Sequence, residues 1–248
     1  MSEPACFTLP DGRRLAYRHA AGSGPTIVFL PGYRSDMAGS KAQAVMDWAM
    51  AQGRACLLFD YSGCGRSEGE FAHGTLSRWR NELIALIDHC APGRVVLVGS
   101  SMGGWLALLL AERLGARVAA LIGIAAAPDF TDWGFDAAAK RRLAAGKVVL
   151  ADNPYGPEPT PTYPAFWADG QAQLRLGAPI GFAGPVRLVH GQADADVPWQ
   201  IALRLGEALR SSDVQTILIK DGDHRLSRPA DIALLLATLA SLMQELAA

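Results

Sequence analysis

A serine stands between two glycines in the segment Gly99-Ser100-Ser101-Met102-Gly103, directly after the apolar run 95–98. The run predicts a buried strand, and the segment from residue 102 onward predicts a helix. A G-x-S-x-G pattern on a sharp strand-to-helix turn holds its serine in a strained conformation with the hydroxyl exposed, and the glycines let the backbone pack closely. The pattern therefore predicts that Ser101 is a nucleophile. The alternative is a tight turn without a catalytic role.

A serine nucleophile needs a neighbouring base. His224 ends the polar segment 221–224, which follows the apolar run 214–219. In sites built on this type of turn, the chain order is nucleophile, acid, histidine. Among the five histidines, only His224 has that order and lies in a loop after a predicted strand. We therefore predict that His224 is the base; a solvent-exposed loop histidine is the alternative.

Two carboxylates, Asp194 and Asp196, follow the apolar run 186–190, where the orienting acid of such a site belongs. The D-x-x-V-P spacing favours Asp194, and Asp196 is then a solvated loop carboxylate. Asp223 is a poorer candidate because side chains adjacent in a loop seldom reach each other in the required geometry. The predicted acid is therefore Asp194, with Asp196 left open.

The negative charge that develops on a carbonyl oxygen under attack needs two preorganised donors. In this arrangement they are backbone N–H groups, one directly after the nucleophile and one in the loop after an earlier strand. Met102 follows Ser101, and the loop after the run 26–30 reads Pro31-Gly32-Tyr33. We predict that the N–H groups of Tyr33 and Met102 form the oxyanion hole.

Apolar runs without polar alternation recur along the chain and are separated by longer amphipathic segments. Such runs are typical of strands buried on both faces of a parallel sheet, and their alternation with helices predicts a doubly wound α/β fold. The predicted strands are 26–30, 55–59, 95–98, 118–124, 186–190 and 214–219, after an opening ribbon at 6–9 and 14–19. The predicted helices are 40–52, 75–90, 102–115, 199–210 and 229–246.

One segment, about 128–184, interrupts the alternation because it contains scattered aromatics and no convincing buried strand. We interpret it as a cap inserted after the sixth strand of a single domain that spans 1–248. Apolar side chains with few polar groups suit an acyl channel, so Trp133, Phe166 and Trp167 are candidate substrate contacts. The alternative, given equal weight, is that these side chains pin the cap to the domain.

Composition and motifs exclude several classes of protein. The net charge of −1 provides no field for nucleic acid, and charged residues and glycines interrupt the apolar stretch 95–127 before it could span a membrane. The chain has no P-loop, dinucleotide fingerprint or metal-ligand spacing, so we expect no cofactor and no metal. Four cysteines without paired spacing indicate reduced thiols, and the N-terminus does not resemble a secretory signal. These features predict a cytoplasmic protein, and they leave the oligomeric state undetermined.

Several motifs together resemble the abhydrolase family of mitochondrial palmitoyl-protein thioesterases, which are also described as esterases of mycophenolic acid acyl-glucuronide. In the motif of this family, Pro-Gly-Tyr replaces the His-Gly that is commoner in α/β-hydrolase folds. The matching segments are 30–42, 59–67, 98–105, 188–199, 223–225 and 230–232.

The resemblance implies an α/β-hydrolase fold, a triad of Ser101, Asp194 and His224, and oxyanion donors at Tyr33 and Met102. It implies hydrolysis of acyl thioesters or esters more strongly than it implies palmitate, because the region 131–176 matches the family least. With no transit peptide recognisable, we expect a bacterial-type cytoplasmic relative. The alternatives are a general carboxylesterase or acyl-glucuronide esterase and, in a different class, a non-enzymatic binding protein on a hydrolase fold.

Overall fold

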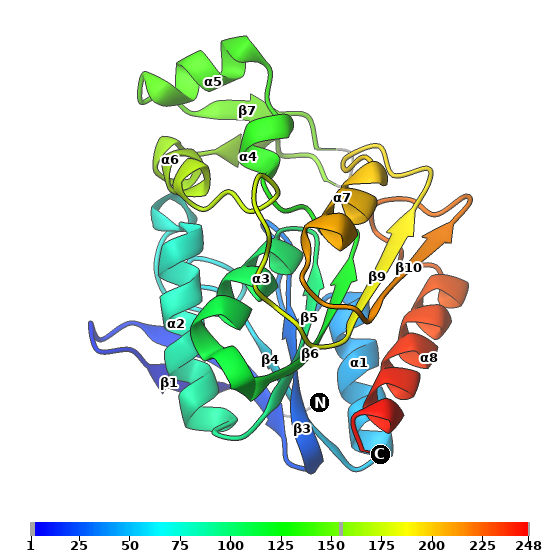
Figure 1. The fold of residues 1–248 in the computed structure, drawn as a ribbon. Helices are drawn as coiled ribbons and strands as arrows, with labels where there is room; N and C mark the ends of the chain where they lie inside the picture. The colour runs from blue at the N-terminus through cyan, green and yellow to red at the C-terminus, as the bar shows by residue number, and fades with distance from the viewer. Residues whose placement is uncertain (1–2, 154–155, 248) are drawn as a thin grey trace.

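The computed structural model describes residues 3–153 and 156–247 and contains one large, mostly parallel sheet flanked by helices (Figure 1). Its eight strands lie in the order β1-β2-β4-β3-β5-β6-β9-β10, and every pairing from β4 to β10 is parallel. The predicted fold class is confirmed. The strands are β1 (Ala5–Thr8), β2 (Arg14–Ala20), β3 (Ser23–Leu30), β4 (Arg54–Phe59), β5 (Val95–Ser100), β6 (Val118–Ile124), β9 (Val186–Gly191) and β10 (Val214–Ile219).

The opening ribbon joins this sheet at its edge. β1 and β2 pair in antiparallel fashion, and β2 also pairs in antiparallel fashion with β4, so that Tyr17 lies opposite Phe59. Every residue of β5 and β6 is buried, as expected from their unbroken apolar sequences. The long-range pairing of β2 with β4 is the part of the sheet that local sequence patterns do not reveal.

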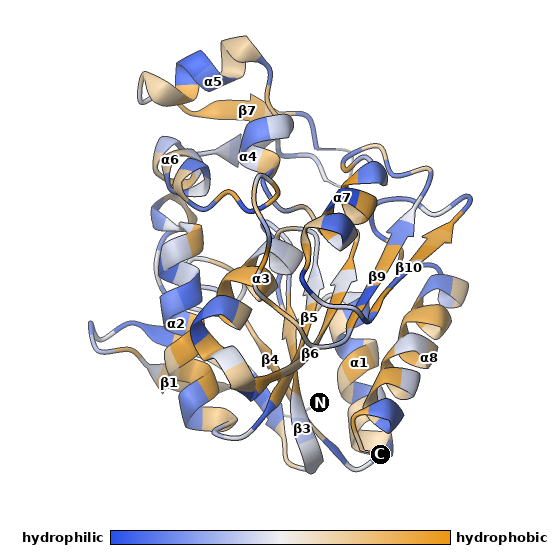
Figure 2. Cartoon of the chain, in the orientation of Figure 1, coloured by the Kyte–Doolittle hydropathy of each residue, from blue (hydrophilic) through white to orange (hydrophobic). Residues whose placement is uncertain are grey.

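Helices cover both faces of the sheet, and successive strand residues point to opposite faces. Leu57 and Leu97 pack with α2, α3 and α7, whereas Leu58 and Val98 pack with α1 and α8. Figure 2 shows hydrophobic residues along β10 and on α3 and α8, and hydrophilic residues in the loops after β9 and β10. The helices are α1 (Ser40–Ala51), α2 (Leu76–Cys90), α3 (Met102–Leu114), α7 (Gln200–Ala208) and α8 (Pro229–Glu245), with short 3₁₀ turns η1 (Phe71–His73) and η2 (Gly115–Arg117).

The cap is the segment between β6 and β9, and it lies over the carboxyl ends of the parallel strands (Figure 1). The sequence predicts no buried strand there. The structure has two three-residue strands that pair only with each other, outside the large sheet. The cap elements are α4 (Phe130–Trp133), α5 (Ala137–Ala144), β7 (Val149–Ala151), β8 (Thr160–Thr162) and α6 (Pro164–Ala172).

None of the helices in the described residues is long and apolar enough to cross a lipid bilayer.

Candidate active site

Ser101 occupies a strained turn between β5 and α3. Its backbone φ of 54° and ψ of −120° lie in a region that residues with a side chain rarely adopt. The Ser101 N–H donates to the Ile124 carbonyl at 2.9 Å, which ties the turn to the neighbouring strand β6. Strain of this kind persists only where surrounding structure enforces it, and it clusters at functional sites. The predicted strand-turn-helix context of the G-x-S-x-G pattern is therefore present.

The two glycines of the pattern are required because the backbone has no room for a side chain. A Cβ on Gly99 would lie 2.3 Å from the Gly103 carbonyl oxygen. A Cβ on Gly103 would lie 2.0 Å from the Leu30 carbonyl oxygen, at the end of β3. Both clashes are with main-chain atoms, which cannot move aside as a flexible side chain could.

Replacing Gly103 by alanine is expected to lower the free energy of unfolding by about 1–3 kcal/mol, the usual range for overpacking a tight core. The added methyl group would push apart the Ser101 turn and the end of β3. Gly93→Ala is the matched control because nothing lies within 4 Å of a Cβ there and its φ is not positive. Urea unfolding measures both, and a Gly103→Ala protein as stable as the Gly93→Ala protein would contradict the packing.

The structure brings Ser101, His224 and Asp194 together from three separate loops. His224 Nε2 lies 3.1 Å from Ser101 Oγ, and His224 Nδ1 lies 2.9 Å from Asp194 Oδ2. The Asp194 side chain is 0% exposed and that of His224 is 15% exposed. A hydroxyl, an imidazole and a buried carboxylate in this order form the arrangement that activates a serine.

Asp194 is held as a carboxylate. Its Oδ1 accepts hydrogen bonds from the N–H groups of Asp196 and Val197 at 2.9 and 2.8 Å, and its Oδ2 faces His224 and a second imidazole, His190. Burial alone would raise the pKa of Asp194, but hydrogen bonds from His190 and His224 outweigh it and lower that pKa well below 3.8. Asp194 is therefore ionised at neutral pH.

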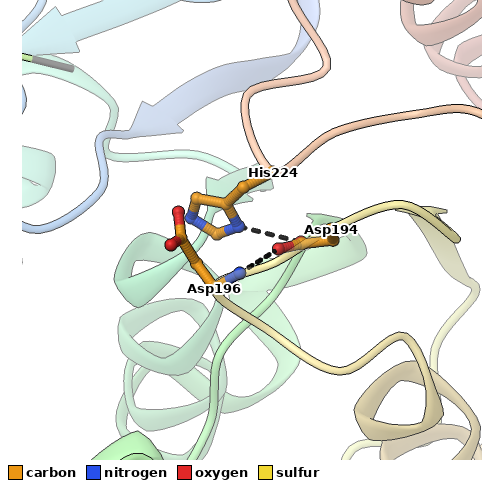
Figure 3. A group of neighbouring side chains, drawn as sticks. All are labelled: Asp194, Asp196 and His224. Atoms are coloured by element: carbon orange, nitrogen blue, oxygen red, sulfur yellow. Dashed lines mark hydrogen bonds and ion pairs between the residues drawn. The ribbon is translucent and has the colours of Figure 1, made fainter. Parts of the chain in front are cut away.

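The other carboxylates near His224 are placed differently. Asp196 is exposed, and Figure 3 shows its carboxylate on the opposite side of the imidazole from Asp194. The Oδ1 of Asp223 accepts the Leu226 N–H at 2.9 Å, which shapes the loop that carries the histidine. Of the three candidate acids, Asp194 is the one that hydrogen-bonds to His224 Nδ1.

The loop predicted to supply an oxyanion donor lies against Ser101. A Cβ on Gly32 would be 3.3 Å from the Ser101 Cβ, so the backbone of this loop lies against the Ser101 turn. Met102 is the first residue of α3, where the N–H has no acceptor within the helix. The buried hydroxyl of Tyr61 donates to the Pro31 carbonyl at 3.0 Å and supports this loop from the core.

Ser101 and His224 open into a cavity of about 600 Å³ between the cap and the sheet. Tyr33, Phe130 and Phe135 form an aromatic part of its lining. Charged side chains form another part of the wall, namely Arg34, Asp36, Lys41, Asp152, Asp196 and Arg225. The cavity can therefore accept a substrate that has both an apolar and a polar portion.

Trp133, Phe166 and Trp167 lie in the cap but outside the lining of this cavity. The indoles of Trp133 and Trp167 donate to the carbonyls of Pro128 and Thr131 at 2.7 and 3.0 Å. Phe166 is 1% exposed and packs against the rings of Tyr33, Trp79 and Phe130. These contacts favour the alternative that the three residues fasten the cap.

Phe130, Phe135 and His190 belong to the site but are not among the residues that the sequence predicts for it. Phe130 and Phe135 line the cavity, and no local pattern distinguishes them from the other cap aromatics. His190 Nε2 lies 3.1 Å from Asp194 Oδ2. The sequence feature that could indicate this contact is the position of His190 at the end of β9, four residues before Asp194.

Among the described residues, one group of three side chains carries potential metal ligands close together: Asp194, Asp196 and His224, with ligand atoms within 4.8 Å of one another. It is the site already described. His224 Nδ1 and Asp194 Oδ2 are engaged with each other at 2.9 Å, so these atoms fit a hydrogen bond better than a shared ion.

Comparison with known proteins defines the class of this molecule. A model of the alpha/beta hydrolase family matches residues 27–235, and the chain belongs to that family. It is accordingly a hydrolase. Human mitochondrial palmitoyl-protein thioesterase ABHD10 is 38% identical to it over 241 residues, which are 96% of this chain and 79% of the relative.

Solved structures agree with this assignment. The alpha/beta hydrolase domain-containing protein 10 from mouse has a TM-score of 0.91 and 36% identity, with 99% of this chain and 100% of that chain covered. A putative hydrolase from Agrobacterium vitis S4 has a TM-score of 0.91 and 40% identity, with 97% and 98% covered. The resemblance found in the sequence motifs is confirmed.

The expected cytoplasmic location is contradicted. The human, mouse and rat relatives are all named as mitochondrial proteins. The expectation rested on unpaired cysteines and on an N-terminus without a recognisable secretory signal or transit peptide, and neither feature specifies a compartment.

Proposed function

We propose that this protein is a serine hydrolase that cleaves acyl thioesters or esters through a Ser101–His224–Asp194 triad and an acyl-enzyme intermediate. One observation carries the proposal. Ser101 Oγ, His224 and Asp194 form a continuous hydrogen-bonded series at 3.1 and 2.9 Å, on a strained turn that opens into a cavity.

His224 takes the Ser101 proton as Oγ attacks the acyl carbonyl carbon, and the N–H groups of Tyr33 and Met102 hold the resulting oxyanion. Collapse of the tetrahedral intermediate breaks the bond to the thiol or alcohol, which leaves with the proton from His224. Water then gives a proton to His224 and attacks the acyl carbon, the bond from that carbon to Ser101 Oγ breaks, and the proton on His224 returns to Oγ as the acid is released. Asp194 stabilises the His224 imidazolium in both steps.

The aromatic part of the cavity suits the acyl group. Phe130 and Phe135, which belong to the cap, line this part of the cavity. The Tyr33 hydroxyl donates to the Pro161 carbonyl at 2.9 Å, so Tyr33 connects the loop after β3 to the cap. Aromatic surfaces bind apolar acyl chains by removing them from water. Relatives named as palmitoyl-protein thioesterases support an acyl substrate of this kind.

A panel of acyl thioesters from acetyl to palmitoyl, tested with purified protein, is expected to give rising kcat/KM with chain length until the cavity is filled. Each buried methylene contributes about 0.8 kcal/mol, or roughly fourfold. Phe135→Ala should reduce kcat/KM for the long chains more than for acetyl. The Ser101→Ala protein gives the background rate. A strong preference for acetyl would contradict an acyl channel.

A second candidate is hydrolysis of acyl glucuronides or other small polar esters by the same triad. It is favoured by the charged part of the cavity wall, where three cationic and three acidic side chains suit a polar leaving group better than an apolar one. Including acyl glucuronides and uncharged esters in the panel separates the two candidates. Faster turnover of the glucuronides than of every thioester would favour this second function.

A further inference from the structure

A second imidazole lies on the carboxylate of the candidate triad. His190, at the end of β9, is 0% exposed, and its Nε2 lies 3.1 Å from Asp194 Oδ2. The same ring nitrogen lies 3.1 Å from the Val197 carbonyl oxygen. His224 Nδ1 faces that same Oδ2 at 2.9 Å. One carboxylate oxygen is therefore shared by two histidines.

The neighbours of His190 determine where its proton lies. Both groups facing Nε2, the Asp194 carboxylate and the Val197 carbonyl, can only accept, so Nε2 carries the hydrogen and donates. Its Nδ1 is buried and has no hydrogen-bond partner among the described residues. A proton there would be a buried donor without an acceptor, which is costly. His190 is therefore a neutral ring with its hydrogen on Nε2.

We propose that His190 is a positioning residue for the acid: its Nε2–H holds Asp194 Oδ2 toward His224 and shares the negative charge of that oxygen with the His224 ring. This inference rests on the proposed triad. A carboxylate oxygen that already accepts one hydrogen bond stabilises a neighbouring imidazolium less than an oxygen that accepts no other hydrogen bond. The negative charge that faces His224 is then divided between two N–H donors on one oxygen, which weakens the pull of Asp194 on the imidazole.

Other charged groups also face His224, and substituting His190 leaves them in place. Asp194 and Asp196 come from the loop after β9. Asp223 and Arg225 belong to the histidine's own loop. Lys41 of α1 lines the same cavity and donates to the Arg225 carbonyl. Because these groups are common to the wild type and to His190 variants, a change in the titration of His224 reports on the lost hydrogen bond.

The test compares two substitutions at one position. His190→Leu removes the donor, whereas His190→Gln carries an amide N–H that can reach the place of Nε2. The Leu variant is expected to lose about 10- to 100-fold in kcat, the cost of one hydrogen bond to a charged group. The pH midpoint of its kcat/KM should also rise, because the undivided Asp194 oxygen would stabilise the His224 imidazolium. The Gln variant should recover the wild-type midpoint and much of kcat.

Two controls separate the possible failures. Fluorophosphonate labelling of Ser101 tests the triad itself: if Ser101→Ala is labelled like the wild type, the proposed function fails whatever His190 does. If Ser101 is the labelled residue but the Leu and Gln variants lose the same activity at an unchanged pH midpoint, His190 is only structural and the inference is overturned.

Nitrogen-15 NMR of the wild type gives a reading that does not depend on a folded variant. The His190 ring is expected to remain neutral, with hydrogen on Nε2, throughout the pH range in which His224 titrates. A His190 ring that becomes protonated in that range, or one that carries its hydrogen on Nδ1, would overturn the inference.

Discussion

Replacing Ser101 by alanine is expected to lower kcat by on the order of 10⁶-fold, because the covalent route is lost with the hydroxyl. A residual rate above that of water remains, since the oxyanion donors are main-chain groups that the substitution leaves in place. The loss should appear in kcat and not in the fold: Ser101 is strained at φ 54°, and alanine occupies the same backbone with one atom fewer. Urea unfolding should therefore give a similar free energy for both proteins.

Covalent labelling with a fluorophosphonate is the direct measurement for Ser101. The wild type should be labelled at one serine and lose activity in proportion, and the Ser101→Ala protein should not be labelled. Ser241→Ala, on the outer helix α8, is the matched control and should be labelled like the wild type. Equal labelling of the Ser101→Ala protein would assign the nucleophile elsewhere.

Asp194→Asn is expected to lower kcat by at least about 10⁴-fold, and the asparagine NH₂ would also face the Nε2–H of His190, a second donor. Oδ1 accepts two main-chain N–H groups at 2.9 and 2.8 Å, so the asparagine oxygen takes that position and its NH₂ takes the place of Oδ2. The NH₂ then donates to His224 Nδ1, and the ring hydrogen moves to Nε2, which faces Ser101. A ring with its hydrogen on Nε2 cannot accept the serine proton.

Asp196→Asn distinguishes between the two acids that the sequence left open. The Asp196 side chain is exposed and its N–H donates to Asp194, so its substitution should cost less than about tenfold in kcat, as expected of a residue outside the triad. Steady-state kinetics of both variants on one acyl ester makes the comparison. A larger loss from Asp196→Asn than from Asp194→Asn would identify Asp196 as the acid.

The Asp194→Asn substitution is also expected to change how the free energy of unfolding depends on pH. The folded protein holds the pKa of Asp194 below its ordinary value of 3.8, because hydrogen bonds from His190 and His224 outweigh the effect of burial. Folding is therefore stabilised by this group above about pH 4, and that contribution is lost as the pH falls below it. In urea unfolding at a series of acidic pH values, the free energy of unfolding of the Asp194→Asn protein should therefore fall less steeply below about pH 4 than that of the wild type.

Much of the architecture could be predicted because it is encoded locally. Unbroken apolar runs mark strands buried on both faces, and the helices between them begin and end within two residues of the predicted positions. The Ser101 turn is also local, since the glycines that it requires are two residues away on either side. His224 and Asp194 could be predicted because the carboxyl ends of parallel strands meet at one edge of a sheet.

The tertiary structure alone decided which side chains share a surface. Nothing local separates Phe135, which lines the cavity, from Trp167, which bonds to the cap's own backbone, because the difference lies in how distant elements pack. The contact between His190 and Asp194 likewise depends on the path of the loop after β9. The sequence by itself determined the strained Ser101 turn and the class of fold that carries it, because both depend on patterns among neighbouring residues. The shape of the cavity and the second histidine on the acid followed only from packing between segments far apart in the chain.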